Sequence, residues 1–271
     1  MSVPDWVILV YLGYLAAILP LRPLSASRRL RFLLGAVPLA GAVAGAAACL
    51  PPAALRLVRL WLPLASALLC YWLAGLFFVS PQPAMEDRFI AFDRRVGVWE
   101  GKRVWAVSAP RLVLECAEAA YFGGYLILPV GILALIGAGR TDQAARFWTV
   151  VLLAVLGCYA VLPWIRTRPP WRVQGESPLD RRPLVMRRLN MFFVLHTSTK
   201  ANTFPSGHVA GAFGTAFAVL SCCPVTGVWF VVGAIGVAVG TIVGEYHYAV
   251  DAVAGALVAL AAWGLVALAG L

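Results

Sequence analysis

Two short polar segments, each containing a histidine, hold the residue types that phosphate chemistry needs. The first spans residues 204–208 and the second residues 247–251. In the second segment, His247 and Asp251 are four residues apart, so they share one face of a helix. A carboxylate in that position accepts one imidazole N–H, fixes the tautomer and leaves the other ring nitrogen to act as a nucleophile.

The first segment reads Phe-Pro-Ser-Gly-His and is typical of the start of a helix. Pro205 suits the first helical turn, and Ser206 and Gly207 leave the backbone amides of that turn accessible. Such amides and the positive end of the helix dipole favour a bound anion. We therefore expect Ser206, Gly207 and His208 to contribute to a phosphate site.

The rest of the chain is dominated by apolar sequence. Of the 271 residues, 62% are hydrophobic and 13% are charged, whereas about 25% are charged in soluble globular domains. A helix needs about 20 apolar residues to cross a membrane, and it satisfies its own backbone amides. The sequence therefore predicts an all-α integral membrane protein. The eight expected spans are residues 6–20, 32–50, 60–79, 112–136, 147–164, 206–221, 225–243 and 246–271.

Most basic residues lie in three connections that the alternation of the spans places on one face of the membrane. Residues 21–31, 80–111 and 165–203 hold 18 of the 22 Lys and Arg residues. This placement favours an anionic lipid surface or an anionic substrate as the partner, and not nucleic acid. Residues 80–111 are expected to form one or two amphipathic helices at the interface, anchored by Trp99 and Trp105, or else a solvated loop.

One transmembrane hairpin is expected to bring the two histidines together. The chain crosses the membrane after His208, turns at Pro224 and crosses back to end near Glu245. The two legs are nearly equal in length, so His208 and His247 should lie at similar depth on the same face. The basic connection 165–203 joins that face, which leaves room for a phosphate-sized anion among the three segments.

Two motifs of the chain resemble those of a known family. Residues 202–208 (Asn-Thr-Phe-Pro-Ser-Gly-His) and 246–251 (Tyr-His-Tyr-Ala-Val-Asp), with Gly255 following, resemble the second and third signature motifs of the type 2 phosphatidic acid phosphatase superfamily. The order of segments is similar to the branch that includes inositol phosphorylceramide synthases. Residues 86–97 and the stretch Thr-Arg-Pro-Pro-Trp at 167–171 also resemble that branch.

This resemblance covers roughly the last six spans and implies a division of the chain. Residues 58–271 would form a six-helix catalytic membrane domain, with an interfacial segment at 80–111 and a basic loop at 165–203. Residues 1–57 would add two N-terminal transmembrane helices. The expected protein is a multi-pass protein of a bacterial plasma membrane.

The resemblance also implies phosphoryl transfer through a phosphohistidine, without a metal or other cofactor. Carried over to this chain, His247 is the nucleophile, Asp251 its orienting carboxylate, and His208 the general acid that protonates the leaving alkoxide. Ser206 and the Gly207 amide would hold phosphate oxygens, since such a cradle contributes much of this kind of catalysis. Arg168 is expected to bind the phosphate as well, and further candidate substrate contacts are Arg166, Arg172, Lys200 and Glu118.

Two cationic positions of the family pattern are not cationic here. The first motif has a Lys seven positions before its Arg-Pro, where this chain has Val161. The third motif often has an Arg six positions before its His, where this chain has Thr241. Either Arg166, Arg172 or Lys200 substitutes, or the substrate differs from a simple phosphomonoester.

Several interpretations stay open at this point. The expected function is hydrolysis of a lipid phosphate or diphosphate, but a headgroup transferase with an alcohol acceptor, helped by Glu115 and Glu118, has the same motifs. A lipid-binding or transport protein, and a metal site formed by the two histidines and Asp251, are further alternatives. The positive-inside rule places the basic face in the cytoplasm, whereas relatives commonly have their active site outside.

Overall fold

The computed structural model describes residues 1–175, 177–202 and 204–270, so Thr203 of the histidine motif at 202–208 lies outside the described residues. Within them the chain is helical, and a single β-bridge joins Thr167 to Asn202. The long helices are α1 (Val3–Ile18), α2 (Ala26–Cys49), α3 (Pro52–Gly75), α6 (Arg111–Gly137), α7 (Ala144–Val161), α10 (Gly207–Cys222), α11 (Pro224–Val243) and α12 (Ala249–Leu268). The others are α4 (Pro83–Arg95), α5 (Val98–Ser108), α8 (Pro170–Val173) and α9 (Val185–Thr197).

The eight predicted spans correspond to these eight long helices. Seven of them are long and apolar enough to cross a membrane, α1 together with the 3-10 helix Leu19–Leu21 that continues it. Helix α10 is apolar but has only 16 residues. Since α10 is enclosed by α6, α7, α11 and α12, its backbone lies against protein rather than lipid. The chain is thus an all-α, multi-pass integral membrane protein.

Helix α7 lies at the centre of the bundle, where α1, α3, α10 and α12 all pack on it. Its buried side chains include Phe147, Trp148 and Leu152. The Trp148 indole donates to the Leu60 carbonyl oxygen over 3.0 Å and fastens α7 to α3. Leucine, valine and tryptophan side chains on the outer helices remain exposed, as expected where lipid replaces water.

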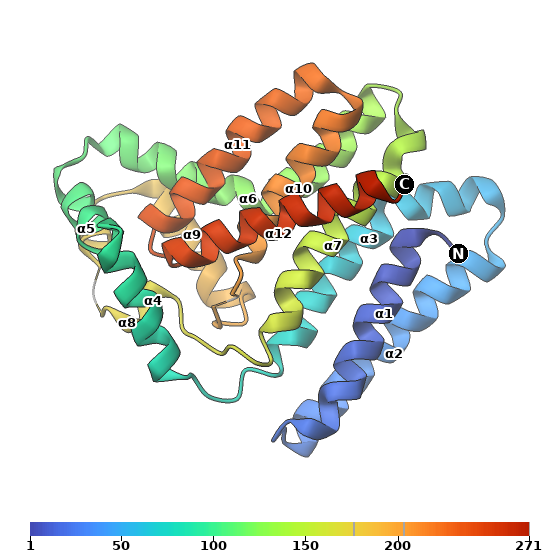
Figure 1. Cartoon of the computed structure of the whole chain (residues 1–271), viewed down its shortest axis with the longest axis horizontal. Helices are drawn as coiled ribbons and strands as arrows, with labels where there is room; N and C mark the ends of the chain where they lie inside the picture. Colours follow the sequence, from blue (N-terminus) through green and yellow to red (C-terminus); the bar gives the residue numbers. More distant parts are fainter. Residues whose placement is uncertain (176, 203, 271) are drawn as a thin grey trace.

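Helices α1 and α2 form a hairpin against α3 and α7 (Figure 1). The Tyr14 hydroxyl donates to the Ala160 carbonyl oxygen (2.6 Å), and the Arg28 guanidinium donates to the carbonyl oxygens of Leu76 and Phe78 (2.8 Å each). These bonds tie the N-terminal hairpin to the ends of α3 and α7 that carry the connections to the site.

The third span begins earlier than predicted. Residues 52–59 belong to α3 and not to a loop, because Pro52 occupies the first helical turn, where a missing N–H costs nothing. Arg59, expected before the span, lies within it and pairs with Asp5 at 2.9 Å. Residue 57 therefore falls inside α3, and the N-terminal hairpin ends at the turn before Pro52.

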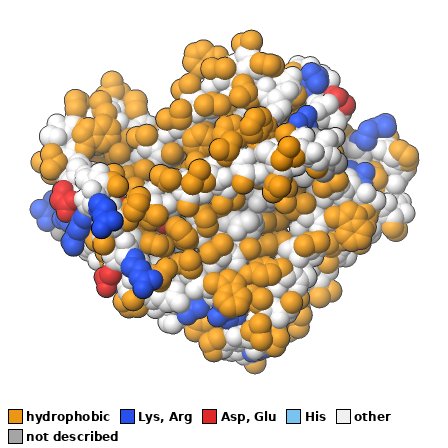
Figure 2. Space-filling model, viewed as in Figure 1, with side chains coloured by type: hydrophobic (Ala, Val, Ile, Leu, Met, Phe, Trp, Pro, Cys, Tyr) orange, Lys and Arg blue, Asp and Glu red, His pale blue; other side chains and the backbone are white. Residues whose placement is uncertain are grey.

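The segment 80–111 forms two short helices, α4 and α5, as one of the two interpretations predicted. With α8 and α9 they gather at one end of the long helices (Figure 1). Lys and Arg side chains lie over this region in Figure 2, while hydrophobic side chains cover the middle of the visible face. The prediction that Trp99 is an interfacial anchor is wrong, since Trp99 is buried and stacks on Tyr248 with ring centroids 6.3 Å apart.

Candidate active site

The α10–α11 hairpin brings the two histidines together, as predicted. His208 is the second residue of α10, and His247 lies in the turn between α11 and α12. Their ring centroids are 5.9 Å apart, with the rings inclined by 61°. Both side chains line the same cavity, which has a volume of about 390 Å³. A phosphate group at this end of the cavity would contact both imidazoles.

Asp251 holds His247 from the first turn of α12. Its Oδ2 atom lies 3.3 Å from His247 Nδ1 and also accepts hydrogen bonds from the Tyr248 amide (3.0 Å) and from Asn202 Nδ2 (2.8 Å). Asp251 is fully buried. Because this carboxylate accepts from Nδ1–H, the lone pair of the neutral imidazole is on Nε2.

Asn202 has a role that sequence reasoning did not assign, although it begins the histidine motif at 202–208. Its backbone amide donates to the Thr167 carbonyl oxygen (2.8 Å), and its side-chain amide reaches both Thr167 Oγ1 (3.0 Å) and Asp251. Asn202 therefore connects the Arg-Pro segment to the carboxylate that orients His247. A polar residue at the beginning of the motif was the only sequence signal for it.

Ser206 and Gly207 form the start of α10. The Ser206 hydroxyl caps the helix by accepting from the Val209 amide at 3.4 Å, and the Ser206 amide donates to the Asp251 carbonyl oxygen at 2.9 Å. Ser206 is fully buried, whereas Gly207 lines the cavity. A Cβ on Gly255 would lie 2.6 Å from the Ser206 carbonyl oxygen, so glycine is required there for α10 and α12 to meet.

Aromatic rings surround His208 on the cavity side. The Tyr121 and Tyr125 rings of α6 lie with centroids 5.4 and 5.0 Å from the His208 ring. Other rings come from α3, α7, α8, α9 and the turn before α12, and with aliphatic side chains they make the wall mostly apolar. These further aromatic residues are Tyr71, Trp72, Tyr159, Trp171, Phe193 and Tyr246.

Lys200 is the sole Lys or Arg among the described residues that line the cavity. Its backbone is in the left-handed region with φ of 58°, which a non-glycine residue adopts only when its surroundings impose it. Arg172 Nη1 donates to its carbonyl oxygen (3.1 Å), and its amide donates to Ser198 Oγ (3.1 Å). The backbone of this residue is therefore held in place where it lines the cavity.

The other predicted cations lie outside the cavity lining. The Arg168 guanidinium forms a two-point ion pair with Glu86, with Nε–Oε1 and Nη2–Oε2 distances of 3.0 and 2.7 Å. Arg166 donates to the carbonyl oxygens of Ser80 and Pro163, and Arg172 to that of Lys200. Each guanidinium is thus used to join segments of the protein.

The two positions that depart from the family pattern have structural roles. Val161 is the last residue of α7. Thr241 is fully buried, its hydroxyl donates to the Val237 carbonyl oxygen (2.6 Å), and its own carbonyl oxygen accepts from the Tyr246 and His247 amides. Thr241 therefore supports the turn that carries His247.

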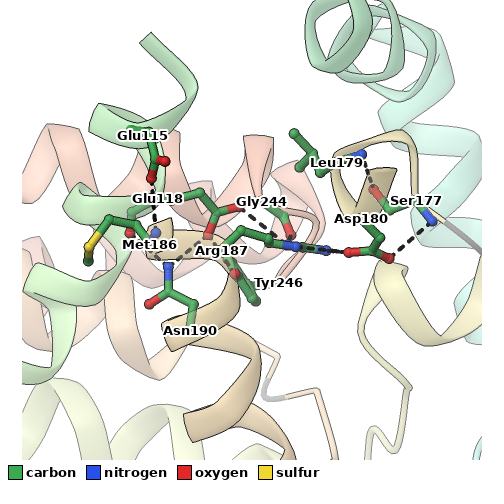
Figure 3. Close-up of polar contacts among 10 residues, drawn as sticks. All are labelled: Glu115, Glu118, Ser177, Leu179, Asp180, Met186, Arg187, Asn190, Gly244 and Tyr246. Atoms are coloured by element: carbon green, nitrogen blue, oxygen red, sulfur yellow. Dashed lines mark hydrogen bonds and ion pairs between the residues drawn. The ribbon is translucent and has the colours of Figure 1, made fainter. Parts of the chain in front are cut away.

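Glu118, a predicted substrate contact, lies in a buried network beside the cavity (Figure 3). Its carboxylate accepts from the Tyr246 hydroxyl (2.6 Å), from Asn190 Nδ2 (2.7 Å) and from Arg187 Nη1 (3.4 Å). Arg187 also donates to the Gly244 carbonyl oxygen and to Asp180 Oδ1. The network joins α6 and α9 to the residues directly before His247.

Glu115 has a different use from the predicted acceptor pocket. Its two carboxylate oxygens accept from the backbone amides of Val185 and Met186, at 2.7 and 2.9 Å. These amides belong to the first turn of α9 and have no partner within the helix. Glu115 therefore ties the first turn of α9 to α6.

Replacing Glu118 with alanine is expected to lower the free energy of unfolding by about 2 kcal/mol, because it strands the buried Arg187, Asn190 and Tyr246 groups. Unfolding in mixed micelles measures this, and Glu118→Gln, which keeps an acceptor, should cost less. Glu100→Ala is the control, since Glu100 is exposed and its contact with Arg94 is long. A loss for Glu118→Ala no larger than for the control would contradict the role of the network.

The metal-site alternative needs three ligands around one ion. Among the described residues, no group of three or more His, Cys, Asp or Glu side chains has a metal-binding arrangement. Asp251 Oδ2 contacts His247 Nδ1. The other ring nitrogen, Nε2, is the one that remains for a ligand in the cavity.

Comparison with protein families matches residues 87–265, more than half of the chain, to the PAP2 superfamily, named for type 2 phosphatidic acid phosphatases. Comparisons with curated proteins and with solved structures give no match. The matched range contains both histidine motifs and the helices that pair them. By this match, and with the arrangement of helices described above, the chain belongs to the PAP2 superfamily.

Proposed function

We propose that the protein is a membrane lipid phosphatase that hydrolyses a lipid phosphate or diphosphate through a phosphohistidine. One observation carries the proposal: His208 and His247 lie in the wall of a cavity that is otherwise mostly apolar. The lining residues of α3 extend from Leu64 to Trp72, and Leu68 and Trp72 are also exposed on the outer surface. A hydrocarbon chain along α3 with its phosphate at the histidines fits this wall.

In the first step, His247 Nε2 attacks the phosphorus atom, and the bond between phosphorus and the leaving oxygen breaks. His208 gives its proton to that oxygen, so the lipid leaves as an alcohol, or as a phosphate if the substrate is a diphosphate. Asp251 accepts from Nδ1–H and stabilises the positive charge that the ring acquires. We expect Lys200 and the start of α10 to bind the phosphate oxygens.

In the second step, water attacks the phosphorus atom and the phosphorus–nitrogen bond breaks. The neutral His208 takes the proton of the attacking water, which returns both histidines to their starting states. The balance of the cycle is one water consumed and one phosphate released. No other reactant is required.

A headgroup transferase is the second candidate, and the charge of the cavity favours it. A phosphomonoester carries up to two negative charges and a diphosphate more, whereas a phosphodiester carries one. With Arg168 bound to Glu86, Lys200 is the one Lys or Arg that the described lining offers. In this reaction an alcohol replaces water in the second step.

A direct test uses the purified protein with lipid monophosphates, lipid diphosphates and phosphodiester lipids, each with and without an alcohol acceptor. Phosphate release that His247→Ala abolishes supports the phosphatase, and transfer to the alcohol supports the transferase. Activity that survives a strong chelator and is inhibited by vanadate supports the phosphohistidine. If the protein binds lipid but neither releases phosphate nor transfers it to the alcohol, and His247→Ala binds equally well, the result would support a binding or transport protein.

Lys200→Ala is expected to raise KM for the lipid phosphate about tenfold, with a smaller fall in kcat, because a charge-assisted contact to phosphate contributes about 1.5 to 3 kcal/mol. Steady-state kinetics in mixed micelles measures both constants. The matched control is Arg188→Ala, which removes an exposed cation of the same connection that does not line the cavity. Equal KM values for the two variants would contradict the phosphate contact.

A further inference from the structure

One face of helix α4 contacts the segments that build the site. Glu86, Phe89 and Asp93 are spaced three, four and seven residues apart, so they lie on that face, and all three are buried. Glu86 accepts from the Arg168 amide (2.8 Å) in addition to binding its guanidinium. Although burial acts against it, the Arg168 bonds hold the pKa of Glu86 below its usual value.

Phe89 lies between the two histidine motifs. Its ring centroid is 4.8 Å from that of Phe204 in the motif at 202–208 and 5.5 Å from that of Tyr248 in the motif at 246–251. Trp99 of α5 stacks on the other side of this group, on Tyr248. Helices α4 and α5 therefore pack aromatic rings against both histidine motifs, and this packing explains why Trp99 is buried.

Asp93 makes the most direct contact with the catalytic segment. Its Oδ1 and Oδ2 atoms lie 3.0 and 3.2 Å from the Ala249 amide nitrogen, and Asp93 is fully buried. Ala249 is the first residue of α12 and lies midway between His247 and Asp251. A carboxylate at this place satisfies an amide that has no partner in the helix and complements the helix dipole.

A buried cation accompanies this carboxylate. Lys102 of α5 is 5% exposed, and its ammonium lies 4.4 Å from the centroid of the Trp99 ring. With the Gln174 amide oriented to suit its neighbours, Gln174 accepts from Lys102 (3.0 Å) and donates to Glu245 (3.3 Å). Without this cation, the burial of the Asp93 and Glu245 carboxylates would cost far more free energy.

We propose that Asp93 is a positioning residue of the active site, which fixes the first turn of α12 and through it the His247–Asp251 pair. The inference rests on the proposed function for its catalytic consequence. It goes beyond the two histidine motifs because it assigns a role to the acidic stretch at 86–97. Asp93 touches neither the substrate nor the reacting nitrogen, and it acts through the Ala249 amide.

The test compares Asp93→Ala, Asp93→Asn and Asp87→Ala in the full chain. Asp93→Ala is expected to lower kcat about 30-fold with KM within about twofold, since a small displacement of a reacting group costs one to two orders of magnitude. Asp93→Asn keeps an oxygen for the Ala249 amide and should recover most of kcat. Asp87 is exposed on the same helix, and Asp87→Ala should match the wild type.

Hydrogen exchange gives a readout that does not depend on activity. The peptide covering residues 246–252 should exchange faster in Asp93→Ala than in the wild type, in Asp93→Asn or in Asp87→Ala. If the wild type proves inactive on every lipid tested, the proposed function fails, and this comparison still decides whether Asp93 holds the helix end. Unchanged exchange in Asp93→Ala, or a kcat within twofold of the wild type, would overturn the inference, as would an Asp93→Asn variant as slow as Asp93→Ala.

The pH dependence adds a signature of the carboxylate. Burial raises the pKa of Asp93 from 3.8 to about 6, and the Ala249 amide and Lys102 oppose this rise while Asp251 adds to it. Glu245 and Arg103 are the remaining charged groups near Lys102. Below about pH 6 the protonated Asp93 is a weaker acceptor, so the kcat ratio of wild type to Asp93→Asn should fall between pH 7.5 and 5. A constant ratio would contradict this pKa.

Discussion

His247→Ala should lower kcat by about 10⁴-fold or more on any lipid phosphate that the protein accepts, with the protein still folded. The variant lacks the nitrogen that forms the covalent bond to phosphorus, and removal of a nucleophile leaves only the rate that binding and electrostatics supply. His247 is nearly buried, and its ring contacts Asp251 and the cavity wall. Phosphate release in mixed micelles measures the loss.

The matched control for this variant is His196→Ala. His196 lies at the end of α9, where its Nδ1 atom contacts the Phe192 carbonyl oxygen at 2.7 Å and its side chain is exposed. That variant should keep the wild-type rate. Trapping with a radiolabelled substrate should give an acid-labile, base-stable phosphoprotein in wild type and His196→Ala only. A label that persists in His247→Ala would exclude His247 as the nucleophile.

His208→Ala should have an effect that depends on the leaving group. For an alkyl phosphate, loss of the general acid should lower the rate about 10³-fold, because the alkoxide then leaves without a proton. An aryl phosphate with an acidic phenol leaves as a stable anion, so the first step should be nearly as fast as in the wild type. His208 faces His247 across 5.9 Å between ring centroids, which suits a proton donor on the leaving-group side.

Rapid mixing separates the two steps in this variant. Because His208 is also the base for water, the phosphohistidine should accumulate, and one equivalent of the phenol should appear as a burst before slow turnover. The Tyr125→Phe variant is the control, since it keeps the ring that packs on His208 but removes the hydroxyl. Equal losses for alkyl and aryl phosphates in His208→Ala would argue against a general acid and for a structural or metal-binding role.

Much of the fold follows from local sequence. Apolar runs of about 20 residues can exist in a bilayer only as helices, so the spans were predictable within a few residues at most ends. The hairpin argument placed His208 and His247 on one face because equal legs return the chain to the same depth. The spacing of His247 and Asp251 also predicted their contact, since one helical turn separates them.

The partners of the charged residues depend on contacts far apart in the sequence. Arg168 was expected at the phosphate, but Glu86 lies opposite its guanidinium and binds it at two points. Glu118 was expected to contact substrate, yet α9 and Tyr246 enclose it. A residue type indicates that a buried charge needs a partner, whereas the packing of helices decides which partner it has.

The sequence by itself determined the class of the protein, its spans and the residues of the two histidine motifs, because hydropathy and short spacing encode these features. Only the tertiary structure decided that the cavity is walled by aromatic rings of α3, α6 and α9, and that Lys200 is the one Lys or Arg in its described lining. It also decided that Asp93 reaches the first amide of α12. These features arise where segments from different parts of the chain meet, 156 residues apart in the case of Asp93 and Ala249, and no local pattern specifies such a meeting.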